Sequence, residues 1–301
     1  MIEPAFLQKN DTVAILSTAR KITLNEIQPA IDLLKNWGLQ VQIGKTIGLE
    51  ENQFAGSDEE RANDFQQMLD NPKIKAIWCA RGGYGTVRII DTLDFTEFKK
   101  HPKWIIGYSD VTVLHSHIHN LGFQTLHATM PLDVSKNTNE ALSTLKKSLF
   151  GETISYQIES SKENKFGNCS GELVGGNLSM FYSLLGSESS INTNDKILFI
   201  EDLDEYLYHI DRMLMNLKGN GYFENLKGLI VGGMTDMHDN AIPFGKSAKE
   251  IILDAVSKYD FPVVFDFPAG HLKDNRALVL GRNIELEVRE NNTKLKYTLQ
   301  I

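Results

Sequence analysis

Short apolar runs alternate with helical stretches through the first part of the chain. Two of these runs are 11–17 (DTVAILS) and 75–79 (KAIWC), and residues 24–37 between them carry apolar side chains at helical spacing. A further strand is expected at 103–106, followed by a helix over 111–121. Alternation of this kind predicts a parallel sheet with helices on both faces.

The sequence changes in character after residue 150. Residues 159–170 are rich in Ser, Asn and Lys and show little apolar periodicity. The 301 residues leave room for two domains. We therefore expect a Rossmann-like or flavodoxin-like α/β domain at 1–150, a linker at 151–170, and a smaller β-rich domain at 171–301, a partial barrel with one helix at 208–217. Its strand candidates are 173–174, 197–200, 229–231, 263–265, 277–280 and 284–288.

Charge and cysteine content narrow the possible classes of protein. The formal net charge of −8 argues against a general nucleic-acid or anionic-membrane surface and favours a small polar or peptide ligand. Cys79 and Cys169 show no metal-binding spacing and suit free thiols in a reducing compartment. No apolar run reaches eighteen residues and the start lacks a leader-like apolar segment, so the expected location is the cytoplasm.

Ser109 is placed where a strand is expected to turn into a helix. In a nucleophile elbow, such a turn exposes a serine hydroxyl, and the following backbone N–H and the helix N-terminus favour a developing oxyanion. The match to G-x-S-x-G is partial, because Val111 stands at the second glycine position. The alternative is that Ser109 only caps the helix, a role that serine performs well.

A catalytic serine needs a base and a group that orients the base. His271 follows the apolar segment 263–267, in a loop. Glu201 and Asp202 end the apolar run 197–200, and the carboxyl ends of strands are where α/β proteins collect site residues. Each also has a simpler interpretation, His271 as a turn residue and Glu201 as a solvated strand end.

Two further patterns suggest ligand chemistry. The turn 81–85 (Arg-Gly-Gly-Tyr-Gly) allows backbone amides to approach a phosphate or an oxyanion, although its spacing is not that of a P-loop. His115 and His119 share a helix face, which raises the possibility of zinc, but the glutamate of H-E-x-x-H and an obvious third ligand are missing. We expect no metal site, with these histidines packing on the helix and Cys79 packing in its strand.

Together these segments resemble the LD-carboxypeptidase family of serine peptidases, which includes murein tetrapeptide carboxypeptidases and microcin C immunity peptidases. The resemblance covers nearly the whole chain and rests on the order of several motifs. They are FAGSDEER at 54–61, ARGGYG at 80–85, IGYSDVT at 106–112, GGNL at 175–178, LFIED at 198–202, IDRML at 210–214 and Gly270-His271.

The resemblance implies a Ser-Glu-His triad: Ser109 as nucleophile, His271 as general base and Glu201 as the orienting carboxylate. It implies an oxyanion hole formed by the backbone N–H groups of Gly83 and Asp110, a homodimer, and no metal or other cofactor. The implied reaction is removal of a terminal D-amino acid, most simply D-alanine, from the L–D bond of a murein tetrapeptide.

Substrate recognition leaves several alternatives open. Arg81 and Arg276 are candidate cations for the substrate carboxylate, and Tyr84 is a further substrate-binding candidate. Within the family, the other possibility is an immunity-type peptidase that cleaves a peptidyl or aminoacyl nucleotide; residues 201–208 contain no long insertion, which favours the murein branch. From another class, the chain could be a peptide-binding protein without catalytic activity.

Overall fold

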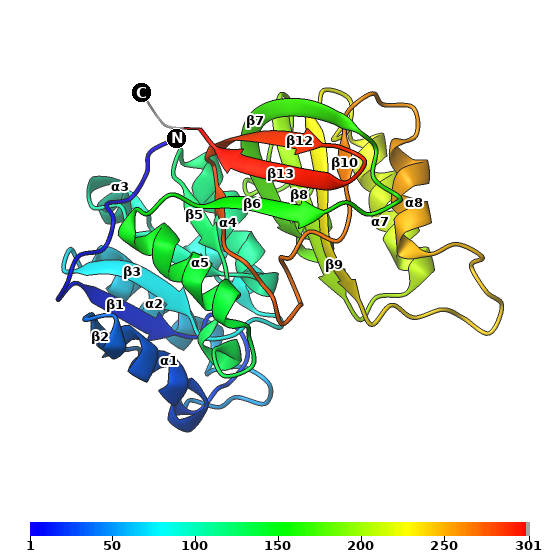
Figure 1. Cartoon of the computed structure of the whole chain (residues 1–301). Coiled ribbons are helices and arrows are strands. Elements are labelled where there is room, and N and C mark those ends of the chain that lie inside the picture. The colour runs from blue at the N-terminus through cyan, green and yellow to red at the C-terminus, as the bar shows by residue number, and fades with distance from the viewer. Residues whose placement is uncertain (299–301) are drawn as a thin grey trace.

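Two β-sheets organise the chain in the computed structural model, which describes residues 1–298 (Figure 1). The first sheet has the order β11-β5-β4-β3-β1-β2 and is parallel except for β11, which pairs antiparallel with β5. Its strands are β1 (Thr12–Leu16), β2 (Gln40–Ile43), β3 (Ile74–Cys79), β4 (Trp104–Gly107), β5 (Thr125–His127) and β11 (Leu278–Leu280).

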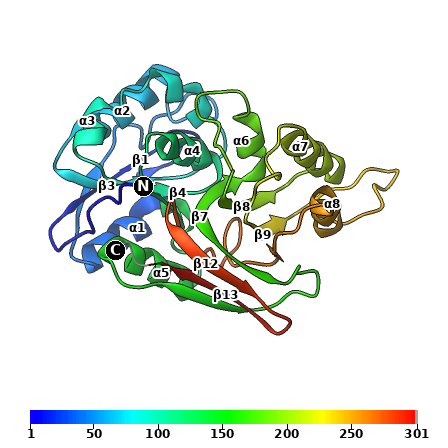
Figure 2. The same ribbon diagram turned by 90° about the horizontal axis from the view of Figure 1, so that it is seen from above.

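Helices cover both faces of this first sheet, as the alternation in the sequence predicts (Figure 2). On one face α1 (Leu24–Asn36) and α5 (Asn139–Phe150) pack in a common core with one set of strand residues, Val13 and Ile15 among them. On the other face α2 (Asp58–Asp70), α3 (Thr96–Lys100) and α4 (Thr112–Asn120) pack with the alternate set. This division follows from the period-two alternation of side chains along a strand.

The second sheet is mixed, and within residues 1–298 it does not close into a barrel. Its order is β10-β9-β8-β7-β12-β13-β6, with β10 to β7 mutually parallel and β7 to β6 antiparallel. A bridge between Lys165 and Val263 brings the chain after β6 back towards β10. The strands are β6 (Ser155–Glu159), β7 (Gly167–Asn177), β8 (Lys196–Leu203), β9 (Gly228–Thr235), β10 (Val263–Val264), β12 (Asn283–Val288) and β13 (Asn292–Tyr297).

Three helices cover one face of the second sheet: α6 (Leu178–Ser183), α7 (Leu207–Gly219) and α8 (Ala248–Val256). The apolar side chains of its other face, such as Leu173 and Phe199, belong to the same core as α1 and α5. One hydrophobic core therefore continues between the two sheets and fixes them against each other. Within the described residues, no helix is both long enough and apolar enough to cross a membrane.

The fold class expected from the sequence is confirmed, with several local differences. Two short 3₁₀ turns, Thr86–Arg88 and Ile90–Thr92, follow the Gly-rich turn. The strand expected at 277–280 is β11, which joins the first sheet instead of the second. The expected linker, 151–170, contains β6 and the start of β7. Both pair with strands far away in the sequence, so local composition does not reveal them.

Candidate active site

Ser109 lies in a sharp turn between β4 and the short 3₁₀ turn Ser109–Val111 that precedes α4. Its φ of 62° is in the left-handed region. The other non-glycine residues with positive φ in 1–298 are all Asn or Asp, which adopt this conformation at lower cost. A Cβ on Gly107 would lie 2.7 Å from Val111 Cγ2, so the glycine allows this tight return. The geometry is that of a nucleophile elbow.

The Gly-rich turn lies directly against this serine. A Cβ on Gly82 would lie 3.0 Å from Ser109 Oγ and 3.4 Å from the backbone nitrogen of Asp110. Gly83 has a φ of +113°. Among residues 1–298, neither the N–H of Gly83 nor that of Asp110 donates a hydrogen bond. Both amides are therefore available to an oxyanion formed beside Ser109.

A buried network holds the turn and the elbow together. The Asp110 carboxylate, fully buried, accepts a hydrogen bond of 2.9 Å from the Thr86 N–H. Arg61, also buried, donates to the carbonyls of Thr18 and Gly85. Burial raises the pKa of Asp110, while hydrogen bonds from Thr86 and Gly85 oppose that rise. The orientation of the two free amides thus depends on the buried side chains of Asp110 and Arg61, which hold the turn in place.

Glu201 and His271 form a hydrogen-bonded pair at the carboxyl edge of the second sheet. The Nδ1–H of His271 donates to Glu201 Oε2 at 2.6 Å, and the His271 backbone N–H donates to the same oxygen at 3.1 Å. Glu201 lies at a register shift between β8 and β9, and such bulges redirect side chains. A Cβ on Gly270 would lie 2.6 Å from this oxygen, so only glycine allows the close approach.

The electrostatics of this pair favour a strong base. Burial of the imidazole lowers the pKa of His271, but the charge and hydrogen bond of Glu201, with smaller contributions from Asp202 and Asp133, outweigh burial and raise it overall. Glu201 is completely buried and the His271 side chain is 14 % exposed. With Nδ1–H directed at the carboxylate, Nε2 retains the lone pair that can accept a proton.

Asp202, the other carboxylate at this strand end, faces a different partner. It accepts hydrogen bonds from the Asn177 side chain and from the Ser179 N–H, both at 2.9 Å. Burial and the neighbouring charge of Glu201 raise its pKa to about 7. Asp202 therefore holds the start of α6, and Glu201 is the carboxylate that contacts His271.

Tyr108 connects the elbow to the histidine. Its ring packs edge-on against His271 with the centroids 4.8 Å apart, and its hydroxyl donates to Asp133 Oδ2 at 2.9 Å. Because Tyr108 precedes Ser109 directly, this contact brings the two halves of the candidate triad to one place. Within residues 1–298, Ser109 Oγ and His271 do not share a hydrogen bond. Catalytic hydrogen bonds of this kind often form only with substrate present.

The candidate substrate-binding residues differ in their surroundings. Arg81 donates to the carbonyl of Lys21 at 3.0 Å. Arg276 is paired with Asp274 at 2.9 Å. Tyr84, 41 % exposed, packs against Phe54 beside the Gly-rich turn. The two arginines are thus already engaged, whereas Tyr84 is open to a ligand.

The three histidines of α4 point to different partners. His115 Nε2 is 3.0 Å from the Gly107 carbonyl, and burial lowers its pKa to about 4. His117 contacts Ser189, and His119 contacts Glu172 on β7. Burial raises the pKa of the Cys79 thiol to about 12. These side chains act in packing and local hydrogen bonds.

Two residues at the site were not identified from the sequence. Arg20, just after β1, lies against Gly83; its place at the carboxyl end of a strand is the same signal that pointed to Glu201. Asn275, fully buried, accepts a hydrogen bond of 2.8 Å from the Gly270 N–H and so supports the loop that carries His271. No spacing in the sequence indicates the contact of Asn275.

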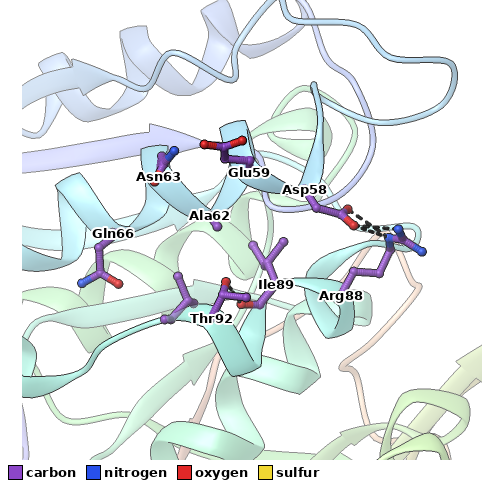
Figure 3. A pocket seen from close by; sticks show the side chains of 9 residues that line it. Asp58, Glu59, Ala62, Asn63, Gln66, Arg88, Ile89 and Thr92 are labelled. Carbon is purple, nitrogen blue, oxygen red and sulfur yellow. Dashed lines mark hydrogen bonds and ion pairs between the residues drawn. The ribbon is translucent and has the colours of Figure 1, made fainter.

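A separate pocket of about 310 Å³ lies between α2 and the 3₁₀ turns that follow the Gly-rich turn (Figure 3). Its lining includes Asp58 and Arg88, which form an ion pair at one end, and Ile89 and Thr92. Ser109, Glu201 and His271 are absent from this lining. The pocket is therefore distinct from the candidate active site.

Known proteins share this sequence and fold. Residues 13–128 match the model of the LD-carboxypeptidase N-terminal domain, and residues 170–286 match that of the LD-carboxypeptidase C-terminal domain. A probable murein peptide carboxypeptidase of Bacillus subtilis is 36 % identical, over 98 % of this chain and 94 % of that protein. The microcin C7 self-immunity protein of Escherichia coli is 26 % identical, over 96 % of this chain and 94 % of its own.

A solved structure gives the same result for the fold. The muramoyltetrapeptide carboxypeptidase of Oxalobacter formigenes superposes with a TM-score of 0.85 at 27 % identity, covering 96 % of this chain and 99 % of that chain. The two matching domain models together span more than half of the sequence. The chain belongs to the LD-carboxypeptidase family of peptidases.

Proposed function

We propose that the protein is a serine carboxypeptidase that releases the terminal D-alanine from the L–D bond of a murein tetrapeptide. The observation that carries this proposal is the buried Glu201–His271 pair, packed through Tyr108 against a serine in an elbow conformation. The names of the Bacillus and Oxalobacter relatives support the substrate class. Only three residues separate β8 from α7, which favours a peptide over a bulky nucleotide substrate.

In the first half of the reaction, Ser109 Oγ attacks the scissile carbonyl carbon while His271 Nε2 takes the hydroxyl proton. The negative charge that develops on the carbonyl oxygen is stabilised by the N–H groups of Gly83 and Asp110. Glu201 keeps Nδ1 protonated and stabilises the imidazolium that forms. His271 then gives its proton to the nitrogen of the departing D-alanine, which leaves an ester on Ser109.

In the second half, water replaces the departed amine. His271 removes a proton from the water, the resulting hydroxide attacks the ester carbonyl, and the same two amides hold the second oxyanion. Collapse of this intermediate breaks the bond to Ser109 Oγ, which regains its proton from His271. The products are the shortened peptide and free D-alanine.

The test is mass spectrometry of a purified muropeptide tetrapeptide incubated with wild type and with Ser109→Ala, in the presence of a chelator. We expect wild type to release one D-alanine and Ser109→Ala to be at least about 10³-fold slower, because the nucleophile is gone. Ser183→Ala is the matched control, since the Ser183 hydroxyl is exposed and donates only to a carbonyl of its own helix.

Two outcomes would contradict the proposal. Equal release by wild type and Ser109→Ala would remove Ser109 from the mechanism. Absence of release by wild type would exclude this substrate, and peptidyl nucleotides would be tested next, since one relative is a microcin self-immunity protein. A homodimer and a cytoplasmic location stay predictions; light scattering and cell fractionation would test them.

A further inference from the structure

Arg20 lies against the same Gly-rich turn that contacts Ser109. A Cβ on Gly83 would lie 2.5 Å from Arg20 Cδ and 2.7 Å from Arg20 Nε. From the next residue of the turn, a Cβ on Gly82 would lie 3.0 Å from Ser109 Oγ. The Arg20 side chain and the candidate nucleophile therefore contact two consecutive glycines of one turn.

The backbone of Arg20 is fixed while its guanidinium is free. The Arg20 carbonyl accepts a hydrogen bond of 2.7 Å from Ser17 Oγ, and Arg20 forms an antiparallel bridge with Phe54. Arg20 is exposed, and within residues 1–298 its guanidinium has neither a hydrogen bond nor an ion pair. A charged group in a defined position without a partner is suited to bind an anion.

The other arginines around the turn are already engaged. Arg81 donates to a backbone carbonyl, and Arg276 is paired with an aspartate. Arg88 makes a bidentate pair with Asp58 at the pocket of Figure 3. Arg276 and Arg88 are thus held by carboxylates and Arg81 is directed at a backbone carbonyl, whereas the Arg20 guanidinium has no partner within residues 1–298.

A carboxypeptidase places a carboxylate close to its oxyanion hole by necessity. Only the C–N, N–Cα and Cα–C bonds lie between the scissile carbonyl carbon and the terminal carboxylate carbon, and their lengths limit this separation to about 4.3 Å. A cation beside Gly83 therefore lies within reach of that carboxylate when the scissile carbonyl oxygen faces the Gly83 amide.

We propose that Arg20 binds the terminal carboxylate of the substrate and so confines the enzyme to the last peptide bond. This inference rests on the proposed carboxypeptidase function and assigns to Arg20 the role for which Arg81 and Arg276 are the candidates from the sequence. The planar guanidinium can meet both carboxylate oxygens at once, which orients the departing residue as well as holding it.

The experiment compares two substrates, a muropeptide tetrapeptide with a free terminal carboxylate and the same peptide with a terminal carboxamide. The formation rate of the shortened peptide is measured by mass spectrometry for wild type, Arg20→Gln, Arg20→Lys and Arg289→Gln. Arg289 is an exposed arginine paired with Glu287 and serves as the control for loss of one positive charge.

We expect wild type to prefer the carboxylate substrate. Arg20→Gln lowers kcat/KM for that substrate by about 10- to 100-fold, chiefly through KM, and leaves the slow reaction of the carboxamide unchanged, so the preference collapses. Arg20→Lys retains part of the preference because it keeps the charge without the planar pair of donors. Arg289→Gln behaves as wild type.

Two results would overturn the assignment. If Arg20→Gln keeps the wild-type preference, another group binds the carboxylate. If Arg20→Gln slows both substrates equally, its role is structural. Failure of the proposed function is recognised separately, because wild type itself would then release nothing from either substrate.

Discussion

Replacement of Glu201 by Gln removes a buried charge while it keeps the shape of the side chain. The Glu201 carboxylate is 2.6 Å from His271 Nδ1 and completely buried, so solvent screens the pair little. At an effective dielectric constant of about 20, unit charges about 4 Å apart attract by about 4 kcal/mol. This attraction acts on the imidazolium that forms in the transition state. Its loss corresponds to about a 10³-fold fall in kcat.

The pH dependence of the same variant gives an independent readout. In wild type the pKa of His271 is raised overall, and activity falls as the pH drops through it because the base becomes protonated. Without the carboxylate, burial is the main influence on the imidazole and lowers its pKa. The acid limb of the kcat profile of Glu201→Gln should therefore move to lower pH, although its plateau is far below that of wild type.

The assay is steady-state release of D-alanine from a tetrapeptide between pH 5 and pH 9, which is about the range in which histidine titrates. Glu172→Gln is the matched control, because Glu172 accepts a hydrogen bond of 2.7 Å from His119 at another place in the fold. KM should stay within a few-fold of wild type in both variants. The reasoning is refuted if Glu201→Gln keeps more than a tenth of the wild-type kcat, or if its acid limb does not move.

Two further substitutions test the turn and the core. Gly82→Ala should lower kcat/KM by about 10²-fold with little change in thermal stability, because the added Cβ would displace the Ser109 hydroxyl. The control is Gly219→Ala, which has open space around it and should leave activity unchanged. Lys103→Met should cost about 2 to 4 kcal/mol in denaturant unfolding, because buried Lys103 donates to three carbonyls at the end of α2. Lys100→Met, at an exposed position, should change the free energy of unfolding by less than about 0.5 kcal/mol. Normal activity of Gly82→Ala, or equal stability of the two lysine variants, would contradict these expectations.

Local patterns predicted the elements whose stability comes from one face. The apolar run 11–17 and the helical spacing of 24–37 correspond to β1 and α1. The sequence did not predict β6 and β13, because each strand has polar residues on one face and the two strands pair with each other. Their pairing is a property of the folded chain and leaves only a weak trace in either segment.

For the site, the sequence brings each motif to a strand end without specifying how the side chains meet. The position of Ser109 after β4 could be inferred from the switch between strand and helix periodicity, but its left-handed φ and its contact with Gly82 needed the structure. Likewise, the run 197–200 predicts a strand end at Glu201 and Asp202. As consecutive residues of β8 they point to opposite faces, and only the structure shows that one contacts His271 and the other Asn177.

The sequence by itself determined the alternation of strands and helices, the presence of an elbow serine, a loop histidine and strand-end carboxylates, and the resemblance to the LD-carboxypeptidase family. The tertiary structure decided which groups share a site: it joined β11 to the first sheet, packed Tyr108, the residue before Ser109, against His271, and set Arg20 beside Gly83. The physical reason is the separation along the sequence over which each kind of interaction acts. Periodicity and turn chemistry act over a few residues, whereas these contacts join segments tens to more than a hundred residues apart and exist only once both sheets pack on their common core.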